Sequence, residues 1–373
     1  MSKFNKPKKP VSRVVVTGGP CAGKTSVLKR SATELLKRNL TPIIVPEAAT
    51  ILLNKGFLPT EKDFQEKVLQ LILSSEKKAY EIALAYQSEG KNPIILCDRG
   101  ALDARAYMSE NAFERIIKNA GHNIVSLRDE QYDAVFHLLT AANGKEDFYT
   151  LANNSARKET PEQARELDLK TQNAWIGHTH FRIIDNGYAT FVGKQKNFFK
   201  ELYHSLGLPE PSEIERKYLI DPKFTVNDFP KDVYKASVRI AQTYLISKHA
   251  DLSERVRSRS QGRFGTYSFN QKKDSPDPIV RFEQESKILE TEYNAFLKNA
   301  DPDYQTLHKN RTLFVNQNQY MEFDTLIKPH PGKKYLEVEL SNKNQKVFLP
   351  NWLPIVDEVT GQKEHSMKHL ARR

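Results

Sequence analysis

The sequence predicts two domains, an α/β domain built on a parallel sheet flanked by helices at residues 11–206 and an α+β domain built on an antiparallel β-barrel at residues 207–373. Up to Leu206, short β-branched runs alternate with long helical stretches, which is the pattern of parallel strands joined by helices. After the Leu-Gly-Leu-Pro-Glu-Pro stretch at residues 206–211, short strands with strict two-residue alternation take over. A length of 373 residues also suits two domains better than one.

The composition limits the class of protein. A net charge of +11 predicts attraction to anions, but it does not distinguish nucleic acid, acidic lipid and nucleotide phosphates. Cys21 and Cys97 are too few for a disulfide framework or a cysteine zinc site, which fits a reducing compartment. No apolar run approaches the roughly 20 residues of a membrane span. Residues 1–10 are expected to form a disordered basic arm and not a secretory signal. We therefore expect a cytoplasmic protein that binds membranes peripherally at most.

In the first domain, the alternating pattern identifies candidate strands and the connections between them. Connections such as Glu61–Gln87 are long and helix-rich, which favours parallel strands. Between Asn143 and Lys170 the apolar content falls and basic residues appear, among them Arg157 and Arg165. This segment is either an exposed excursion over a nucleotide site or a solvated surface helix. The candidate strands are Arg13–Thr17, Ile43–Pro46, Pro93–Cys97, Ala134–Leu139 and Phe181–Ile184.

A phosphate-binding loop follows the first strand. It fits the pattern GxxxxGK[ST], with a strand before it and a helical segment after it, and it consists of Gly18, Gly19, Pro20, Cys21, Ala22, Gly23, Lys24 and Thr25. Its backbone N–H groups and the following helix N-terminus suit a β-phosphate. Lys24 would reach the β- and γ-phosphate oxygens, and Thr25 would bind Mg2+. The loop predicts a nucleoside triphosphate, but without an NKxD motif the sequence does not separate GTP from ATP.

Three residues at strand ends are candidates for catalysis. Asp98 ends the third strand, where a carboxylate can face the metal shell, and its alternative role is to cap a helix. Glu47 follows the second strand and is either a general base or a structural partner for Arg99. Glu47, Asp98 and Arg99 are therefore the candidate catalytic residues, with Arg157 and Arg165 as further candidate nucleotide contacts.

Charged side chains alternate along the strands of the second domain. Glu213, Glu215 and Lys217 share one face of a strand, and like-signed pairs recur on later strands. A wet outer face would also alternate, but both signs recurring over five strands favours faces that turn inward. The candidate polyphosphate-binding residues are Lys217, Arg255, Arg257, Lys272 and Arg311. The candidate ligands for Mg2+ or Mn2+ are Glu213, Glu215, Glu283, Glu285, Asp324, Glu337 and Glu339.

Both domains resemble known families. Glu213-Ile214-Glu215-Arg216-Lys217 resembles the ExExK signature of the CYTH or triphosphate tunnel metalloenzyme family, a likeness that covers Ser212 to Glu358. The first domain is similar to an AAA-like NTPase and kinase family, whose lid would correspond to the excursion described above. Apart from the phosphate loop, this second likeness rests on Val45-Pro46-Glu47-Ala48, Asp98-Arg99-Gly100 and Trp175-Ile176-Gly177-His178.

The order of the two domains carries a further resemblance. Residues 141–149, 164–168 and 358–361 are similar to proteins that combine both domains. This resemblance implies GTP binding, phosphoinositide binding and a part in the vesicular transport of membrane proteins. The alternative is an enzyme with a metal-dependent triphosphatase in the barrel, acting on tripolyphosphate or a related compound, and a small-molecule kinase in front. Nucleic acid is the least expected partner, because no binding motif or aromatic platform accompanies the basic residues.

Overall fold

The computed structural model describes residues 11–61, 63–149, 159–208, 212–247, 252–274 and 280–373, with the backbone alone at 212, 213, 274 and 280–282. The chain divides into two compact units, Met1–Phe198 and Phe199–Arg373. The division falls inside helix α6 (Phe191–Ser205), ahead of the boundary expected after Leu206. The expected basic arm at residues 1–10 lies outside the described residues. Within the described ranges, no helix is both long enough and apolar enough to cross a membrane.

The first unit is built on a parallel sheet, which confirms the predicted α/β class. In the described residues its order is β2-β3-β1-β4-β5, so β1 lies at the centre with Val16 opposite Asp98 of β3 and Thr17 opposite His137 of β4. These pairings bring the carboxyl ends of the three strands to one edge of the sheet. The strands are β1 (Ser12–Thr17), β2 (Thr41–Val45), β3 (Pro93–Asp98), β4 (Ala134–Leu138) and β5 (Phe181–Ile184).

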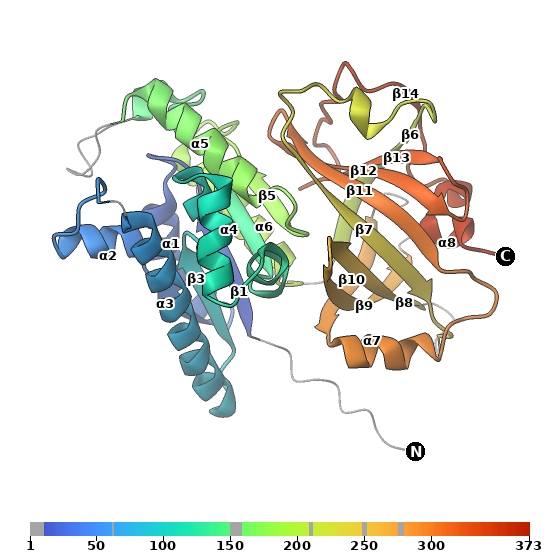
Figure 1. Ribbon diagram of the computed structural model, residues 1–373, viewed down its shortest axis with the longest axis horizontal. Coiled ribbons are helices and arrows are strands. Elements are labelled where there is room, and N and C mark those ends of the chain that lie inside the picture. The colour runs from blue at the N-terminus through green and yellow to red at the C-terminus, as the bar shows by residue number, and fades with distance from the viewer. Residues whose placement is uncertain (1–10, 62, 150–158, 209–211, 248–251, 275–279) are drawn as a thin grey trace. The chain divides into compact units, whose positions relative to one another are not determined.

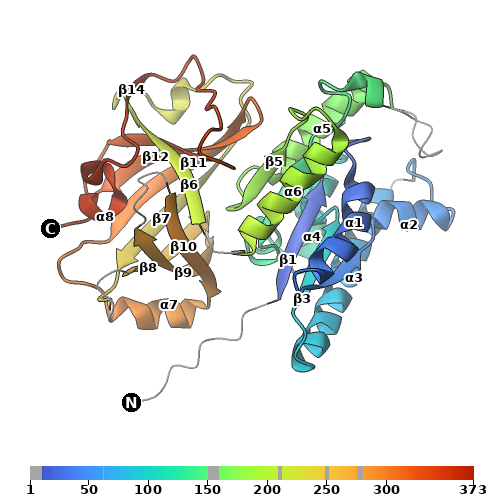
Figure 2. The ribbon, with the colours of Figure 1, turned by 180° about the vertical axis from the view of Figure 1, so that it is seen from behind.

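Helices cover both faces of this sheet. The two views place α3, α4 and α5 on one face and α1 and α6 on the other (Figures 1 and 2). Because both faces are covered, Val14, Val15 and Val16 of the central strand are all 1% exposed or less. The remaining helices are α1 (Lys24–Leu36), α2 (Ala48–Asn54), α3 (Phe64–Ser88), α4 (Glu110–Asn119) and α5 (Pro161–Trp175). Short helical turns occur at η1 (Ala101–Ala106), η2 (Ser126–Glu130) and η3 (Glu146–Phe148).

Helix α5 occupies much of the segment expected to be either an excursion or a surface helix. Thr160 and Gln163 form a capping box, and Pro161 takes the first helical position, where its missing N–H costs nothing. The helix is more than a solvated surface element, because Asp168 on its inner face is 3% exposed. Residues 150–158, which include Arg157, lie outside the described residues.

The second unit is an antiparallel barrel, as predicted. Its described strands run in the order β10-β9-β8-β7-β11-β12-β13-β6-β14, and β10 also pairs with β6, where Val280 lies opposite Ile214, so the sheet closes. Strand β14 pairs with the other end of β6. The strands are β6 (Ser212–Ile220), β7 (Lys235–Tyr244), β8 (Leu252–Gln261), β9 (Phe264–Asp274), β10 (Val280–Ile288), β11 (Leu307–Asn316), β12 (Gln319–Lys328), β13 (Lys334–Glu339) and β14 (Ile355–Glu358). Helices α7 (Glu290–Leu297) and α8 (Met367–Leu370) and the turns η4 (Val226–Asp228) and η5 (Lys363–His365) complete the unit.

The two faces of the barrel wall have different contacts. On the outer face, an aromatic cluster packs loop residues against the strands, with the ring of Phe229 4.7 Å from Trp352 and 5.4 Å from Phe323. Neighbouring residues along a strand face opposite sides of the sheet, so the residues next to the strand members of this cluster face away from it. On that other face, the strand register aligns Lys217 with Glu337 and Arg311 with Asp324. The charged faces of these strands therefore turn inward and line the lumen. At one end of the lumen, an apolar cluster includes Tyr335 together with Val359, Leu370 and Ala371 from the C-terminal segment.

Candidate functional site

The phosphate loop requires glycine at two positions. Gly18 has φ +138°, and a Cβ there would lie 2.1 Å from the carbonyl oxygen of Leu138. Gly23 has φ +90°, and a Cβ there would lie 2.4 Å from the ring of Phe191. Both positions therefore combine a backbone conformation that side chains disfavour with a contact that leaves no room for one. The loop can turn its backbone N–H groups toward a ligand because these two residues are glycines.

Lys24 lies over the loop that precedes it. Its ammonium donates hydrogen bonds to the carbonyl oxygens of Gly18, at 2.8 Å, and Gly19, at 2.9 Å. Burial and the nearby Arg99 together lower the pKa of Lys24 to about 8, although Glu47 opposes the shift. Thr25, in the next position, is exposed at the start of α1 and lines the same cavity. A bound phosphate would give the Lys24 ammonium a charged partner in place of two carbonyl groups.

A buried aspartate that the sequence analysis missed holds the loop from behind. The Oδ1 atom of Asp168 accepts a hydrogen bond of 2.6 Å from the Gly19 N–H and lies 3.2 Å from Nε2 of His137. Its Oδ2 atom accepts a 3.3 Å bond from the N–H of Thr140. Burial would raise the pKa of Asp168, but His137 and these hydrogen bonds lower it. Asp168 thus acts as a charged anchor that joins α5 to the phosphate loop and to the residues after β4.

Removal of this anchor is expected to weaken the loop. Asp168→Ala leaves the N–H groups of Gly19 and Thr140 without their acceptor, and a buried unsatisfied donor costs about 1–3 kcal/mol. We expect a loss of about 2–5 kcal/mol in unfolding free energy and a weaker affinity for nucleoside triphosphate, measured by denaturant titration and calorimetry. Glu166→Ala, on the exposed side of the same helix, is the matched control. Unchanged stability and affinity in Asp168→Ala would show that the loop does not depend on this contact.

Arg99 and Glu47 form an ion pair beside the loop. Arg99 has φ +68°, and its Nε atom donates to Oε1 of Glu47 at 2.6 Å. Burial would raise the pKa of Glu47, but Arg99 and Lys24 lower it to about 2. A carboxylate with so low a pKa is a weak proton acceptor near neutral pH. The contact therefore fits the second of the two roles expected for Glu47, that of partner to Arg99.

Asp98 has one oxygen that no described residue engages. Its Oδ1 atom is buried and has no hydrogen-bond partner among the described residues. Burial raises the pKa of Asp98 to about 6, although Lys24 opposes the shift. The following helical turn η1 starts after Gly100, where the side chain of Asp103 accepts the Gly100 N–H, so Asp98 does not cap it. Together with Thr25, this unengaged carboxylate suits a divalent cation, which prefers oxygen ligands.

The loop and these side chains line one cavity of about 1180 Å³. One part of the wall consists of the phosphate loop with Asp98 and Arg99. Another part is apolar and belongs to α2 and α3, where it includes Ile51, Phe64 and Val68. Ligand pockets usually measure about 300–1,000 Å³. The cavity therefore has room for a nucleotide and for part of a second ligand.

Of the two candidate nucleotide contacts in the basic segment, the structure describes only Arg165. Arg157 lies outside the described residues. Arg165 donates to the carbonyl oxygen of Ala142 at 2.6 Å and pairs with Glu162 at 2.9 Å. It is not among the described residues that line the cavity. Any role for Arg165 in nucleotide binding therefore requires a change in these contacts.

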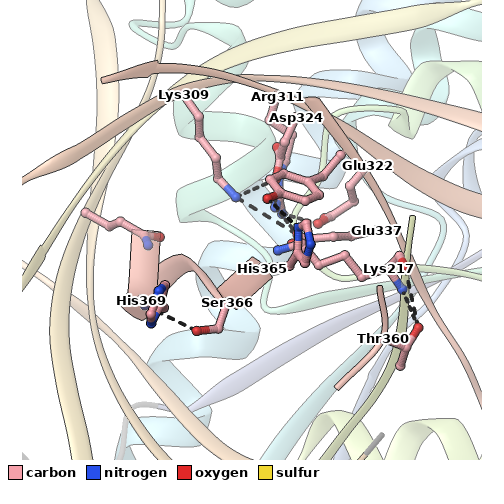
Figure 3. A network of polar contacts seen from close by, with 12 residues as sticks. Lys217, Lys309, Arg311, Glu322, Asp324, Glu337, Thr360, His365, Ser366 and His369 are labelled. Carbon is pink, nitrogen blue, oxygen red and sulfur yellow. Dashed lines mark hydrogen bonds and ion pairs between the residues drawn. The ribbon is translucent and has the colours of Figure 1, made fainter. Parts of the chain in front are cut away.

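The lumen of the barrel contains a dense network of ion pairs (Figure 3). Arg311 binds Asp324 through two parallel hydrogen bonds, 2.8 Å from Nε to Oδ1 and 2.7 Å from Nη2 to Oδ2. Glu337 accepts from Arg311 at 2.6 Å and pairs with Lys217 at 2.9 Å. Glu322 also pairs with Arg311. Candidate phosphate-binding residues and candidate metal ligands are thus bonded to one another.

A second group of ion pairs lies on β8, β9 and β10. Glu283 accepts from Arg255 at 3.2 Å and from the amide of Asn270 at 2.8 Å, and it also pairs with Lys272. Arg257 is held more loosely, with its Nη1 atom 3.9 Å from Oε2 of Glu285. The two networks account for all the candidate cations and four of the seven candidate carboxylates.

The other three candidate carboxylates lie where the first residues of β6 meet the last residues of β13. Glu213 is in β6, but its side chain lies outside the description. Glu215 faces Glu339 across the pairing of β6 with β13. Among the described side chains, no group of three or more His, Cys, Asp or Glu is placed to hold a metal ion. The carboxylates of Glu283, Asp324 and Glu337, in contrast, are bonded to lysine and arginine side chains.

Sequence reasoning overlooked two charged or polar members of the lumen. Lys309 is 2% exposed and its ammonium bonds to Asp324. Burial and the neighbouring Arg311 together lower the pKa of Lys309 to about 8. Asn270 is fully buried and donates to Glu283. Lys309 lies two residues before Arg311, so the alternation that identified Arg311 carried the signal for it.

Comparison with known proteins finds likenesses that each cover part of the chain. The AAA domain family matches residues 13–189. No curated protein matches the chain significantly. The inorganic triphosphatase NE1496 is 23% identical over 43% of this chain and 93% of its own length, with a TM-score of 0.29. PH1819 from Pyrococcus horikoshii OT3 is 16% identical over 36% of this chain and 80% of its own, with a TM-score of 0.29. The putative adenylyl cyclase HpAC1 from Hippeastrum, described as having a dominant triphosphatase activity, is 13% identical over 35% of this chain and 80% of its own, with a TM-score of 0.25.

Proposed function

We propose that the chain is a nucleotide-binding protein in which the first unit binds GTP or ATP with Mg2+ and the barrel binds phosphate chains. The observation that supports nucleotide binding most strongly is the cavity, because Lys24, Thr25 and the unengaged oxygen of Asp98 line it together. Lys24 would neutralise the β- and γ-phosphates, and Thr25 and Asp98 would hold the metal ion. A bound Mg2+ would add charge neutralisation at the phosphate oxygens. Arg99, held by Glu47, would supply a further positive charge.

Titration of the full chain with ATP and GTP tests this proposal. We expect saturable binding of at least one nucleotide in the presence of Mg2+, measured by calorimetry. Removal of Mg2+ with EDTA is expected to weaken that binding. A chain that binds neither nucleotide at millimolar concentration would contradict the proposal.

A second candidate function for the first unit is phosphoryl transfer to a small molecule. It is favoured by the apolar wall formed by Ile51, Phe64 and Val68, which lines the same cavity as the phosphate loop. An acceptor on that wall would lie in the same cavity as Asp98 and Arg99. Release of ADP or GDP that depends on an added acceptor would distinguish this kinase from a protein that only binds nucleotide.

For the barrel, we propose that its ligand is tripolyphosphate or a phosphoinositide headgroup. The order of the domains and the stretches at residues 141–149, 164–168 and 358–361 resemble the TRPL translocation defect protein of photoreceptor cells. This resemblance supports GTP as the nucleotide, phosphoinositide as the barrel ligand and a role in the regulation of vesicular transport of membrane proteins. The alternative function of the barrel is a metal-dependent triphosphatase, and for it Glu283, Asp324 and Glu337 would have to bind metal while they bond to lysine and arginine.

Sedimentation with lipid vesicles tests the phosphoinositide proposal. Vesicles with phosphoinositide and vesicles with phosphatidylserine are matched in total charge, and the salt concentration is raised in steps. Nonspecific attraction is screened over a Debye length of about 8–10 Å, so it falls with salt. We expect a preference for phosphoinositide that persists at high salt. Binding that follows total charge alone would contradict headgroup recognition by the barrel.

A further inference from the structure

The lumen carboxylates act as internal counter-ions. We infer that the barrel binds phosphate chains on its own basic side chains without a divalent metal, and that the inner carboxylates hold those side chains in place. This inference rests on the proposed binding of polyanions by the barrel. It concerns how the ligand is held and not only which ligand it is.

The first observation is that the carboxylate oxygens of Asp324 and Glu337 already bond to lysine and arginine side chains. Both oxygens of Asp324 accept from Arg311, and Lys309 bonds to one of them. The two oxygens of Glu337 are divided between Lys217 and Arg311. A divalent cation needs several oxygen ligands at once. In this part of the lumen, each such oxygen would have to share its lone pairs with an arginine or a lysine.

The opposite wall repeats the arrangement. Oε1 of Glu283 accepts from Arg255 and from Asn270, while its Oε2 atom pairs with Lys272. Its Oε1 atom is therefore engaged by donors from β8 and β9, and its Oε2 atom faces the ammonium of Lys272 in β9. Removal of a partner from a buried ion pair is strongly unfavourable, because the remaining charge is left without compensation. A metal ion at Glu283 would impose that cost on Arg255 or Lys272.

Charge at the centre of the network also opposes a metal ion. Burial would raise the pKa of Glu337, but Lys217, Lys309 and Arg311 lower it well below its usual range. The carboxylate thus stays charged because three cations surround it. Lys217, Lys309 and Arg311 already balance the charges of Glu322, Asp324 and Glu337, so a divalent metal would add positive charge to a network without spare negative charge.

Arg257 is the cation best placed to receive a phosphate. Its Nε atom is buried and has no hydrogen-bond partner among the described residues. Among the described residues, its nearest ion-pair partner is Glu285, whose Oε2 atom lies 3.9 Å from Nη1 of Arg257. Strand register aligns Arg257 with Ser268 and Gln242, with Arg255 two positions along the same strand face. Arg257 can therefore turn to an anion without breaking a close ion pair, while Arg255 and Lys272 remain held by Glu283.

The test uses the full chain carrying Lys24→Ala, so that the phosphate loop does not compete for the probe. Tripolyphosphate is titrated by calorimetry in EDTA and again in excess Mg2+ or Mn2+. We expect saturable binding in EDTA, with an affinity within about threefold of that in metal. Arg257→Gln is expected to weaken binding in EDTA about tenfold or more, because a charged hydrogen bond is lost. Arg257→Lys, which keeps the charge, is expected to retain part of the affinity.

The controls separate the possible outcomes. Arg239→Gln removes the same charge from the exposed outer face of the neighbouring strand β7 and is expected to leave binding unchanged. Near-identical melting temperatures of the variants verify that Arg257→Gln is folded. Binding that occurs only with Mg2+ or Mn2+ would overturn the inference and leave polyanion binding standing. An absence of binding under both conditions would overturn the proposed function of the barrel and this inference with it.

Discussion

Replacement of Lys24 by alanine is expected to weaken nucleotide binding at least about tenfold. Its ammonium lies over the phosphate loop, bonded to Gly18 and Gly19, and a charge-assisted bond to phosphate contributes about 1.5–3 kcal/mol. Calorimetry with ATP and GTP in Mg2+ measures the change. Lys37→Ala, just after the same helix with a side chain 64% exposed, is the control. A folded Lys24→Ala variant with unchanged affinity for both nucleotides would remove the phosphate loop from the site.

Replacement of Arg311 by methionine is expected to destabilise the barrel by about 3–5 kcal/mol, the usual cost of removing one partner from a buried charge network. The change leaves Glu322, Asp324 and Glu337 without their shared guanidinium. Arg239→Met, on the outer face, removes the same charge from an exposed position and is expected to cost less than about 1 kcal/mol.

Urea unfolding can follow the barrel alone. The chain has two tryptophans, Trp175 in the first unit and Trp352 in the barrel. In a Trp175→Phe background, the fluorescence of Trp352 reports the unfolding of the aromatic cluster on the barrel wall. A loss below about 1 kcal/mol in Arg311→Met would mean that the network contributes little to stability and does not hold its cations in place.

The fold could be predicted largely from local patterns. The β-branched runs identified all five strands of the first unit, and the signal was clearest for β1, β3 and β4, because central strands covered on both faces must be apolar along their length. The two-residue alternation identified the charged strands of the barrel. The two compact units divide within helix α6, ahead of the boundary that was expected after Leu206. A turn signal in the sequence marks the end of a helix, and it does not mark the edge of a compact unit.

The functional details depended on contacts that local patterns do not contain. Asp168 meets Gly19 across 149 positions of sequence, so nothing near either residue indicates the contact. The lumen residues were identified by type, but their roles depend on register. The alignment of Arg311 with Asp324 and of Lys217 with Glu337 pairs cations with the expected metal ligands. Alternation predicts which residues share a face, whereas strand register decides which of them neutralise one another.

The central claim is that the chain has two separate phosphate sites, one in each unit. Calorimetry on the full chain tests it most directly, with nucleotide titrated in Mg2+ and tripolyphosphate titrated in EDTA, for Lys24→Ala and Arg257→Gln side by side. We predict that Lys24→Ala weakens nucleotide binding and keeps tripolyphosphate binding, and that Arg257→Gln does the reverse. Loss of both ligands in Lys24→Ala, with Arg257→Gln unchanged for both, would place all phosphate binding at the loop and contradict the account.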